Sequence, residues 1–392
     1  NGLIETASAN TPRFDYDPIS GECRGLLIEE SRVNYFHGTQ PGNGGSVTDG
    51  TATGANGVTA KKFVPTFGNT SFPSLFSYTS YVIPVGSQVA GATVDVSFSG
   101  YFASVANGLY VPDIVVQVDT AGLNPIYAEL LLNLSNGTVW SKGGIGINGV
   151  TELIAPQITL MPFGMYKVTW SIRYTQGATI RDTVRFYIQC RRKGSTLGSN
   201  TGTYYADGVN GFQFSCVQYE IGAFPTSYIP TTTSSVTRSA DNADMTGSNF
   251  TSWANSSVGT FVIRGRGGLE STQNGYGRFV GLGQGGSIGR EGLSTRVGIW
   301  DTTNIFTVTN NSADVVNRNS NIAASFDGTL RRVVLNGVAS SGISGRNINT
   351  IFTQIGLGKN GNSSTNYLNG TLSRVAYYPR QLNDAQMLYL TT

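Results

Sequence analysis

The sequence is poor in cysteine, histidine and charged side chains. Among 392 residues it has three cysteines, Cys23, Cys190 and Cys216, one histidine, His37, and only 12% charged residues. Three scattered cysteines without a CxxC pair exclude a disulfide framework and a cysteine-based zinc site. We expect Cys190 and Cys216 to be buried free thiols; the alternative is a disulfide between neighbouring strands.

A single histidine also limits the catalytic chemistry. His37 precedes a glycine-rich stretch and has no fixed position relative to a nucleophile, so a Ser/His or Cys/His catalytic pair is not indicated. The adjacent carboxylates of Glu29 and Glu30 would point to opposite faces of a strand, which makes them a poor pair for glycoside hydrolysis. The sequence predicts no catalytic residues, and we do not expect an enzyme.

Long apolar runs and clustered basic residues are missing as well. No apolar run approaches the roughly 18 residues needed to cross a bilayer, and the N-terminus has no hydrophobic signal core. The net charge is only +3 and the Lys and Arg residues are mostly dispersed. We therefore expect neither membrane insertion nor a nucleic-acid partner.

Glycine and aromatic residues are abundant, and apolar residues alternate with polar ones. The sequence has 51 Gly, 19 Tyr and 19 Phe, which suits a turn-rich protein built from strands. Residues 166–175, 94–99 and 184–189 alternate with a period of two. The predicted fold class is all-β, with two antiparallel β-sandwich domains of jelly-roll type preceded by an extended N-terminal docking segment.

The domain boundary is predicted in the stretch Gln218–Met245. Pro225 and Pro230 cannot lie in a central strand, and residues 231–235 are all Thr or Ser. The predicted division is residues 1–38 as a docking segment, 39–235 as the first sandwich and 236–392 as the second. The alternative is a long loop within one large sandwich.

The second sandwich is predicted from short strands and two local signals. Strands are expected at 259–263, 278–282, 296–300, 322–326 and 332–335. The pair Asn336-Gly337 indicates a type I′ hairpin because both residues accept positive φ. Asn383 or Asp384 is expected to cap a short C-terminal helix.

A motif near the N-terminus resembles a known group of proteins. Residues 11–18, TPRFDYDP, followed by GLLIE at 25–29, are similar to a signature of bacteriophage virion fibre and spike proteins, of head-spike-fibre or tail-fibre type. The resemblance implies a homotrimeric virion protein, assembled in the host bacterial cytoplasm. The segment has one apolar patch and no second layer, so we expect it to dock on other virion proteins. The docking residues would be Arg13, Phe14, Tyr16, Leu26, Leu27 and Ile28.

Two further stretches resemble carbohydrate-recognition folds. Residues 214–231 look like the last strand of carbohydrate-binding-module-like jelly rolls, and residues 367–387 look like the end of laminin-G/concanavalin-like lectin domains. Sugar recognition uses aromatic faces and planar polar side chains. The candidate glycan-binding residues are Tyr276, Trp300, Asn274, Asp301 and Trp140.

A calcium site is the one cofactor considered. Concanavalin-like folds sometimes hold Ca²⁺, and Asp241 and Asp244 offer suitable oxygens, but their spacing matches no defined loop. The alternative reading of these residues is a solvated linker, and no other cofactor or metal is expected.

The functional hypothesis is a virion fibre or spike adhesin that binds host-surface polysaccharide weakly and multivalently. The alternatives are a capsid decoration protein with only a stabilising role and a virion-associated polysaccharide depolymerase. A depolymerase requires a well-built carboxylate pocket, which the sequence does not indicate.

Overall fold

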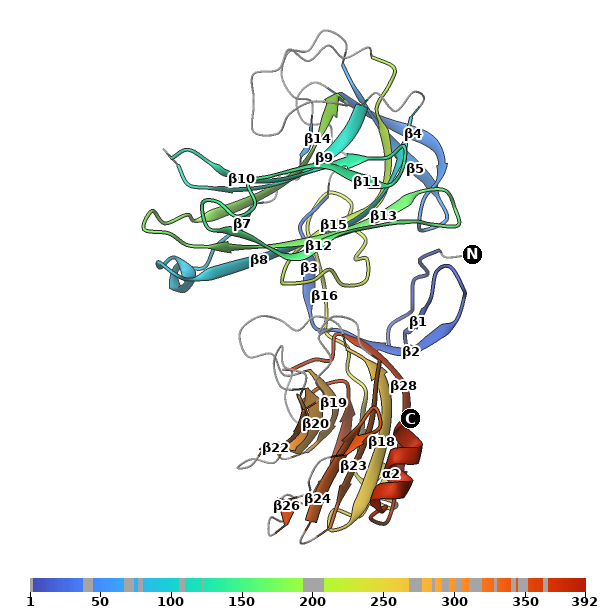
Figure 1. Cartoon of the computed structure of the whole chain (residues 1–392). Coiled ribbons are helices and arrows are strands. Elements are labelled where there is room, and N and C mark those ends of the chain that lie inside the picture. Colours follow the sequence, from blue (N-terminus) through green and yellow to red (C-terminus); the bar gives the residue numbers. More distant parts are fainter. Residues whose placement is uncertain are drawn as a thin grey trace. The chain divides into compact units, whose positions relative to one another are not determined.

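The structure is a computed structural model, and nearly all its regular elements are strands (Figure 1). It describes residues 3–37, 45–66, 74–76, 80–105, 110–121, 123–192, 208–267, 277–283, 286–290, 296–300, 305–309, 319–327, 330–339, 343–344, 352–361 and 366–392. The strands form antiparallel sheets that pack as sandwiches. The predicted all-β class, with antiparallel sandwiches of jelly-roll type, is confirmed.

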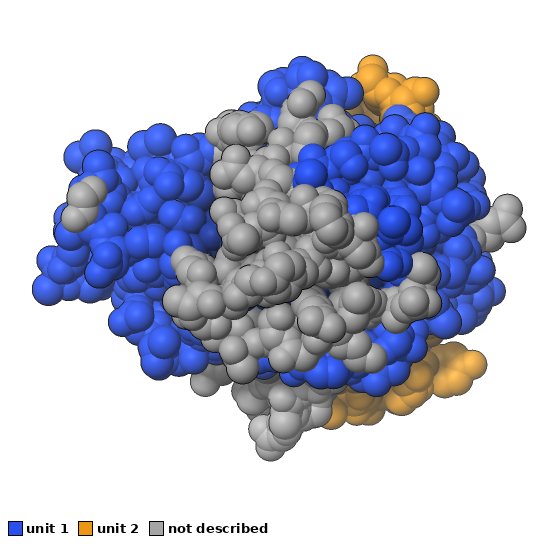
Figure 2. Space-filling view, turned by 90° about the horizontal axis from the view of Figure 1, so that it is seen from above, with its two compact units in different colours: residues 1–6, 18–21, 32–238 blue, residues 7–17, 22–31, 239–392 orange. Residues whose placement is uncertain are grey.

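The chain forms two compact units, coloured separately in Figure 2. Unit 1 comprises residues 1–6, 18–21 and 32–238, and unit 2 comprises residues 7–17, 22–31 and 239–392. The N-terminal residues are therefore shared between the two units. The structure differs here from the prediction of a separate segment over residues 1–38.

The described residues of unit 1 form two large sheets, each named after one of its central strands. The β9 sheet has the order β11 (Thr138–Gly143), β10 (Ile126–Asn133), β9 (Tyr110–Asp119), β14 (Thr183–Arg192) and β6 (Ser74–Phe76), with β7 (Tyr81–Val82) also on β14. The β8 sheet has the order β12 (Val150–Leu160), β13 (Tyr166–Thr175), β8 (Thr93–Ser104), β15 (Phe212–Ile221), β5 (Thr59–Pro65) and β4 (Gly45–Thr53). A small sheet pairs β3 (Arg32–Asn34) with β16 (Val236–Arg238), and a 3₁₀ turn η1 spans Val85–Ser87.

The core of unit 1 follows from the alternation seen in the sequence. In β13, Val168, Trp170 and Ile172 are buried, and Trp170 is paired in register with Phe98 of β8. One face of each sheet therefore supplies apolar side chains to a shared core. The core includes Tyr219, whose hydroxyl donates to the carbonyl of Tyr187 at 3.0 Å, so its polar end is satisfied although the residue is buried.

The described residues of unit 2 also form two sheets. The β18 sheet has the order β1 (Phe14–Tyr16), β2 (Cys23–Ile28), β28 (Gly370–Tyr378), β18 (Gly259–Arg266), β23 (Asn319–Phe326), β24 (Leu330–Leu335) and β25 (Val338–Ala339), with β26 (Ile343–Ser344) also on β24. The β19 sheet has the order β17 (Asp244–Thr246), β27 (Gln354–Leu357), β19 (Arg278–Leu282), β20 (Gly286–Arg290), β21 (Arg296–Trp300) and β22 (Ile305–Thr309). The five strand positions predicted in this half all lie within strands.

The described residues of unit 2 also include two short helices. Helix α1 spans Ser248–Thr251, and helix α2, Asp384–Thr391, packs Met387 against the outer face of the β18 sheet at Val262 and Val334. Asn383 is the N-cap of α2 and forms a capping box with Gln386, which decides between the two predicted caps. Within the described ranges no helix is both long enough and apolar enough to cross a membrane.

The motif-bearing N-terminal residues form a hairpin on the β18 sheet. Strand β2 pairs with β28, with Leu26 opposite Leu372, and β1 pairs with β2. Ile28 is only 2% exposed and packs closely against Gly358. The apolar patch is therefore covered in part within unit 2, at Ile28, and β28 supplies a strand partner that the sequence did not identify.

Candidate functional site

Most of the predicted glycan-binding residues lie outside the part of the chain that the structure describes. Tyr276, Asn274 and Asp301 lie outside the described residues, and Trp300 ends β21 with its side chain not described. Trp140 lies on the edge strand β11 of unit 1, at a β-bulge opposite β10, and is 42% exposed. Trp140 and Trp300 belong to different compact units.

The two carboxylates considered for calcium each have a cationic partner. Asp241 is ion-paired with Arg13 and also accepts the backbone N–H of Glu29 at 2.8 Å. The Nζ of Lys359 lies 2.9 Å from Oδ2 of Asp244. In the ranges that the structure describes, no group of three or more His, Cys, Asp and Glu side chains is arranged to hold a metal ion.

The predicted docking residues fall into two groups. Within unit 2, Arg13 forms ion pairs and Ile28 is buried. Leu26 and Leu27 are half-buried on β2, which pairs with β28. Phe14 and Tyr16 instead project from β1, where they are 53% and 54% exposed. Strand β1 stands at the end of the described order of the β18 sheet, so these two aromatic side chains lie on a sheet edge.

A pocket of about 180 Å³ lies in unit 1, where β15 changes partners along one edge. Strand β5 pairs with β15 only over Phe212–Phe214. Further along, the segment Arg32–His37 takes over, since Asn34 Nδ2 donates to the carbonyl of Val217 at 3.2 Å and the N–H of Tyr35 donates to that of Tyr219. The pocket lies in the gap between these two neighbours.

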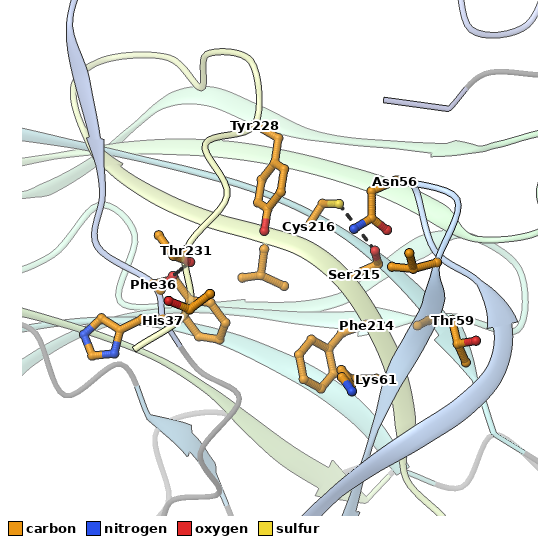
Figure 3. Close-up of a pocket in the computed structure, with 14 residues that line it drawn as sticks. Phe36, His37, Asn56, Thr59, Lys61, Phe214, Ser215, Cys216, Tyr228 and Thr231 are labelled. Carbon is orange, nitrogen blue, oxygen red and sulfur yellow. Dashed lines mark hydrogen bonds between the residues drawn. The ribbon is translucent and has the colours of Figure 1, made fainter. Parts of the chain in front are cut away.

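A β-bulge in β15 shapes this gap. The register of β15 against β8 shifts between Ser215 and Gln218, and Cys216 within the bulge has a φ of 48°. Few residues other than glycine adopt such a backbone conformation, and bulges redirect side chains at functional sites. Cys216 lines the pocket and lies between Tyr228 and Asn56 (Figure 3).

The pocket contains the sole histidine and a cysteine but not a catalytic pair. In Figure 3 the ring of His37 lies at the edge of the pocket and is directed away from Cys216, whose thiol faces Asn56. The backbone N–H of Asn56 contacts the sulfur. Burial raises the pKa of the Cys216 thiol, so the thiolate that a nucleophile needs is disfavoured.

The second constellation that the sequence did not reveal is a buried charge cluster on the β9 sheet. Arg191 of β14 places Nε 2.5 Å from Asp113 of β9 and Nη2 2.5 Å from Glu129 of β10. Asp113 and Arg191 are 0% and 1% exposed. Burial raises the pKa of Asp113 to about 7; Arg191 lowers it and Glu129 raises it further. Two carboxylates thus share one guanidinium, out of reach of a substrate.

Of these two constellations, only the charge cluster had a sequence signal. Asp113 interrupts the apolar run of residues 111–116, and an isolated carboxylate in a buried strand requires a partner. The pocket residues come from 36–61 and 214–232, and no local pattern joins these two stretches.

Comparisons with known proteins add little. The sequence matches no protein-family model and no curated protein. Among solved structures, the chain is similar to domains LG4-5 of the mouse laminin alpha1 chain, with 10% identity over 78% of this chain and 89% of that chain, at a TM-score of 0.24. A likeness of this size carries no argument about function.

Proposed function

We propose that this chain is a structural protein of a bacteriophage virion, a fibre or spike adhesin subunit that binds host-surface glycans. The proposal rests on the resemblance of residues 11–18 and 25–29 to virion fibre and spike proteins. The observation that supports it most directly is the exposure of Phe14 and Tyr16 on β1, within that motif. Exposed aromatic side chains on a sheet edge are suited to protein contact, because an edge strand can also pair through its backbone.

We further propose that β1 docks on another virion protein and that the adhesin is a homotrimer. Of the predicted docking residues, we propose Phe14 and Tyr16 as the main contacts, because they are the most exposed, whereas Arg13 forms ion pairs within the chain and residues 26–28 pair with β28. A virion protein is the expected occupant of the β1 edge, since the motif that contains it resembles virion proteins.

The assembly experiment uses two matched variants. Phe14→Ser/Tyr16→Ser should prevent incorporation into particles while leaving the melting temperature nearly unchanged. Tyr389→Ser is the control, because Tyr389 is 82% exposed on α2 of the same unit. Normal incorporation of the double variant would remove the docking role of β1.

Light scattering of the purified chain tests the proposed trimer. A monomer at micromolar concentration would contradict it.

Glycan binding is proposed at the residues named from the sequence, namely Tyr276, Trp300, Asn274, Asp301 and Trp140. Trp140→Ala and Trp300→Ala are each expected to weaken binding to host cells by about 1–3 kcal/mol if the ring contacts sugar. A glycan array with both variants and the unmodified chain measures this. Unchanged binding with a lower melting temperature would assign that tryptophan to packing.

The alternatives are separated by two measurements. A decoration protein would stabilise particles but bind neither cells nor glycans. A depolymerase would release reducing sugar from host polysaccharide, and we expect none. The buried carboxylates Asp113 and Glu129 do not favour that alternative, since 0% and 6% exposure leaves them closed to a polymer substrate.

A further inference from the structure

We infer that the pocket beside the β15 bulge binds a single carboxylated pyranose ring, such as one uronic acid unit of a host polysaccharide, an assignment that rests on the glycan binding proposed above. Its volume of about 180 Å³ equals roughly six water molecules at liquid density. Sites for larger ligands usually span about 300–1,000 Å³. The pocket therefore suits one ring rather than an oligosaccharide.

The floor of the pocket suits the apolar face of a sugar ring. Phe214, Phe36 and Val217 line it and are each 5% exposed or less. All three belong to the core of unit 1, so their positions are held by packing before a ligand arrives. A preformed apolar surface of this kind lowers the entropic cost of binding.

Polar groups converge on the same space. The hydroxyl of Tyr228 points into the pocket (Figure 3) and is contacted by the backbone N–H of Thr231. Burial raises the pKa of Tyr228 to about 12. The phenol therefore stays protonated and can donate a hydrogen bond to a sugar oxygen. Asn56 and Thr232 add an amide and a hydroxyl to the lining.

The charge of the lining favours an acidic ring. None of the 14 lining residues is Asp or Glu, whereas Lys61 and His37 are among them. Lys61 is the cross-strand partner of Phe214, which places a cation beside the apolar floor. Its Nζ lies 2.7 Å from Asp49, but the two side chains are 46% and 71% exposed. Such an exposed pair is weak and can exchange for a ligand carboxylate.

The test uses the full chain, with methyl glucuronide and methyl glucoside as probes in calorimetric and saturation-transfer NMR titrations. Lys61→Met removes the cation and keeps much of the stem. Lys62→Met is the matched control, because the next residue of a strand points to the opposite face. The unmodified chain should bind the glucuronide in the millimolar range and the glucoside more weakly. Lys61→Met should lose about tenfold in affinity for the glucuronide, and Lys62→Met should lose none.

A second variant tests the pocket independently of charge. Tyr228→Phe removes only the hydroxyl and should weaken the binding of both probes. Because its contact with the Thr231 N–H is also lost, the melting temperature should fall by only a few degrees. The inference is overturned if the unmodified chain binds neither probe, if it binds both equally, or if the two lysine variants behave alike.

Binding to intact host cells separates this inference from the proposed function. Adhesion that survives Lys61→Met and Tyr228→Phe unchanged would overturn the pocket assignment and leave the adhesin intact. Glucuronide binding without any adhesion of the unmodified chain would support the pocket and remove the adhesin.

Discussion

Arg13 and Asp241 stand 228 positions apart in the sequence and form an ion pair, with Nε of Arg13 3.1 Å from Oδ1 of Asp241. Nη2 of the same guanidinium lies 3.0 Å from Glu29. Asp241 in turn accepts the backbone N–H of Glu29. These contacts join the start of β1, the end of β2 and the first residues of the C-terminal half into one network within unit 2.

Removing Arg13 should therefore destabilise unit 2. Arg13→Met leaves two carboxylates without their shared cation, and Glu29 and Asp241 are only 8% and 23% exposed in their side chains. We expect a loss of about 1–3 kcal/mol in the free energy of unfolding, measured by denaturant titration. Arg24→Met is the control: Arg24 pairs with Asp15 and Asp17, which are 37% and 30% exposed, so its loss should stay below about 1 kcal/mol. Equal effects would contradict a special role for Arg13.

A fragment of residues 239–392 should be less stable than one in which residues 7–31 are joined to it by a Gly/Ser linker. Without β2 the edge of β28 is unpaired, which also promotes aggregation. Burial of Ile28 alone is worth about 1.5–3 kcal/mol. The measurement is thermal unfolding of both fragments at equal concentration. Identical melting temperatures would show that the hairpin adds nothing to unit 2.

Asp113 should make unit 1 more stable in mild acid than in mild base. Its pKa is raised to about 7 in the folded chain from 3.8, so the folded state binds the proton more tightly than the unfolded state. This contribution is fully present below about pH 4 and is lost as the pH rises through about 7. Thermal unfolding between pH 5 and pH 8.5 measures this contribution as a shift in melting temperature of about 2–4 °C for each kcal/mol.

Asp113→Asn isolates that effect from the other titrating groups. The amide removes one of two buried negative charges beside Arg191. Above pH 7 the variant should therefore have a higher free energy of unfolding, relative to the unmodified chain, than it has at lower pH. Asp49→Asn is the control, because Asp49 is 71% exposed in its side chain. A difference between Asp113→Asn and the unmodified chain that does not vary with pH would sink the prediction.

The three cysteines should differ in reactivity. Cys23 is exposed, whereas Cys190 and Cys216 are buried, and all three are free thiols. In the native chain one thiol should react rapidly with a thiol reagent, and all three should react after unfolding. Cys23→Ser should abolish the rapid phase. Mass analysis that found Cys190 joined to Cys216 would contradict the structure.

Several local features were predictable because they depend on neighbours in sequence. The alternation in 166–175 predicted which side of β13 is buried. The pair Asn336-Gly337 predicted the hairpin between β24 and β25, and both residues have positive φ, at 47° and 75°. Asn383 was a predicted cap because its side chain reaches only its own helix.

The sequence by itself determined the all-β class and most strand positions, since period-two alternation and turn residues act over a few positions. Only the tertiary structure decided that β2 pairs with the edge of β28, because the local sequence of a strand does not specify which distant strand it will pair with. The same holds for the Asp113–Arg191–Glu129 cluster and for the pocket between β5 and the Arg32–His37 segment. Both bring together segments that are distant in the sequence, and their energetics depend on burial that no stretch of sequence specifies alone.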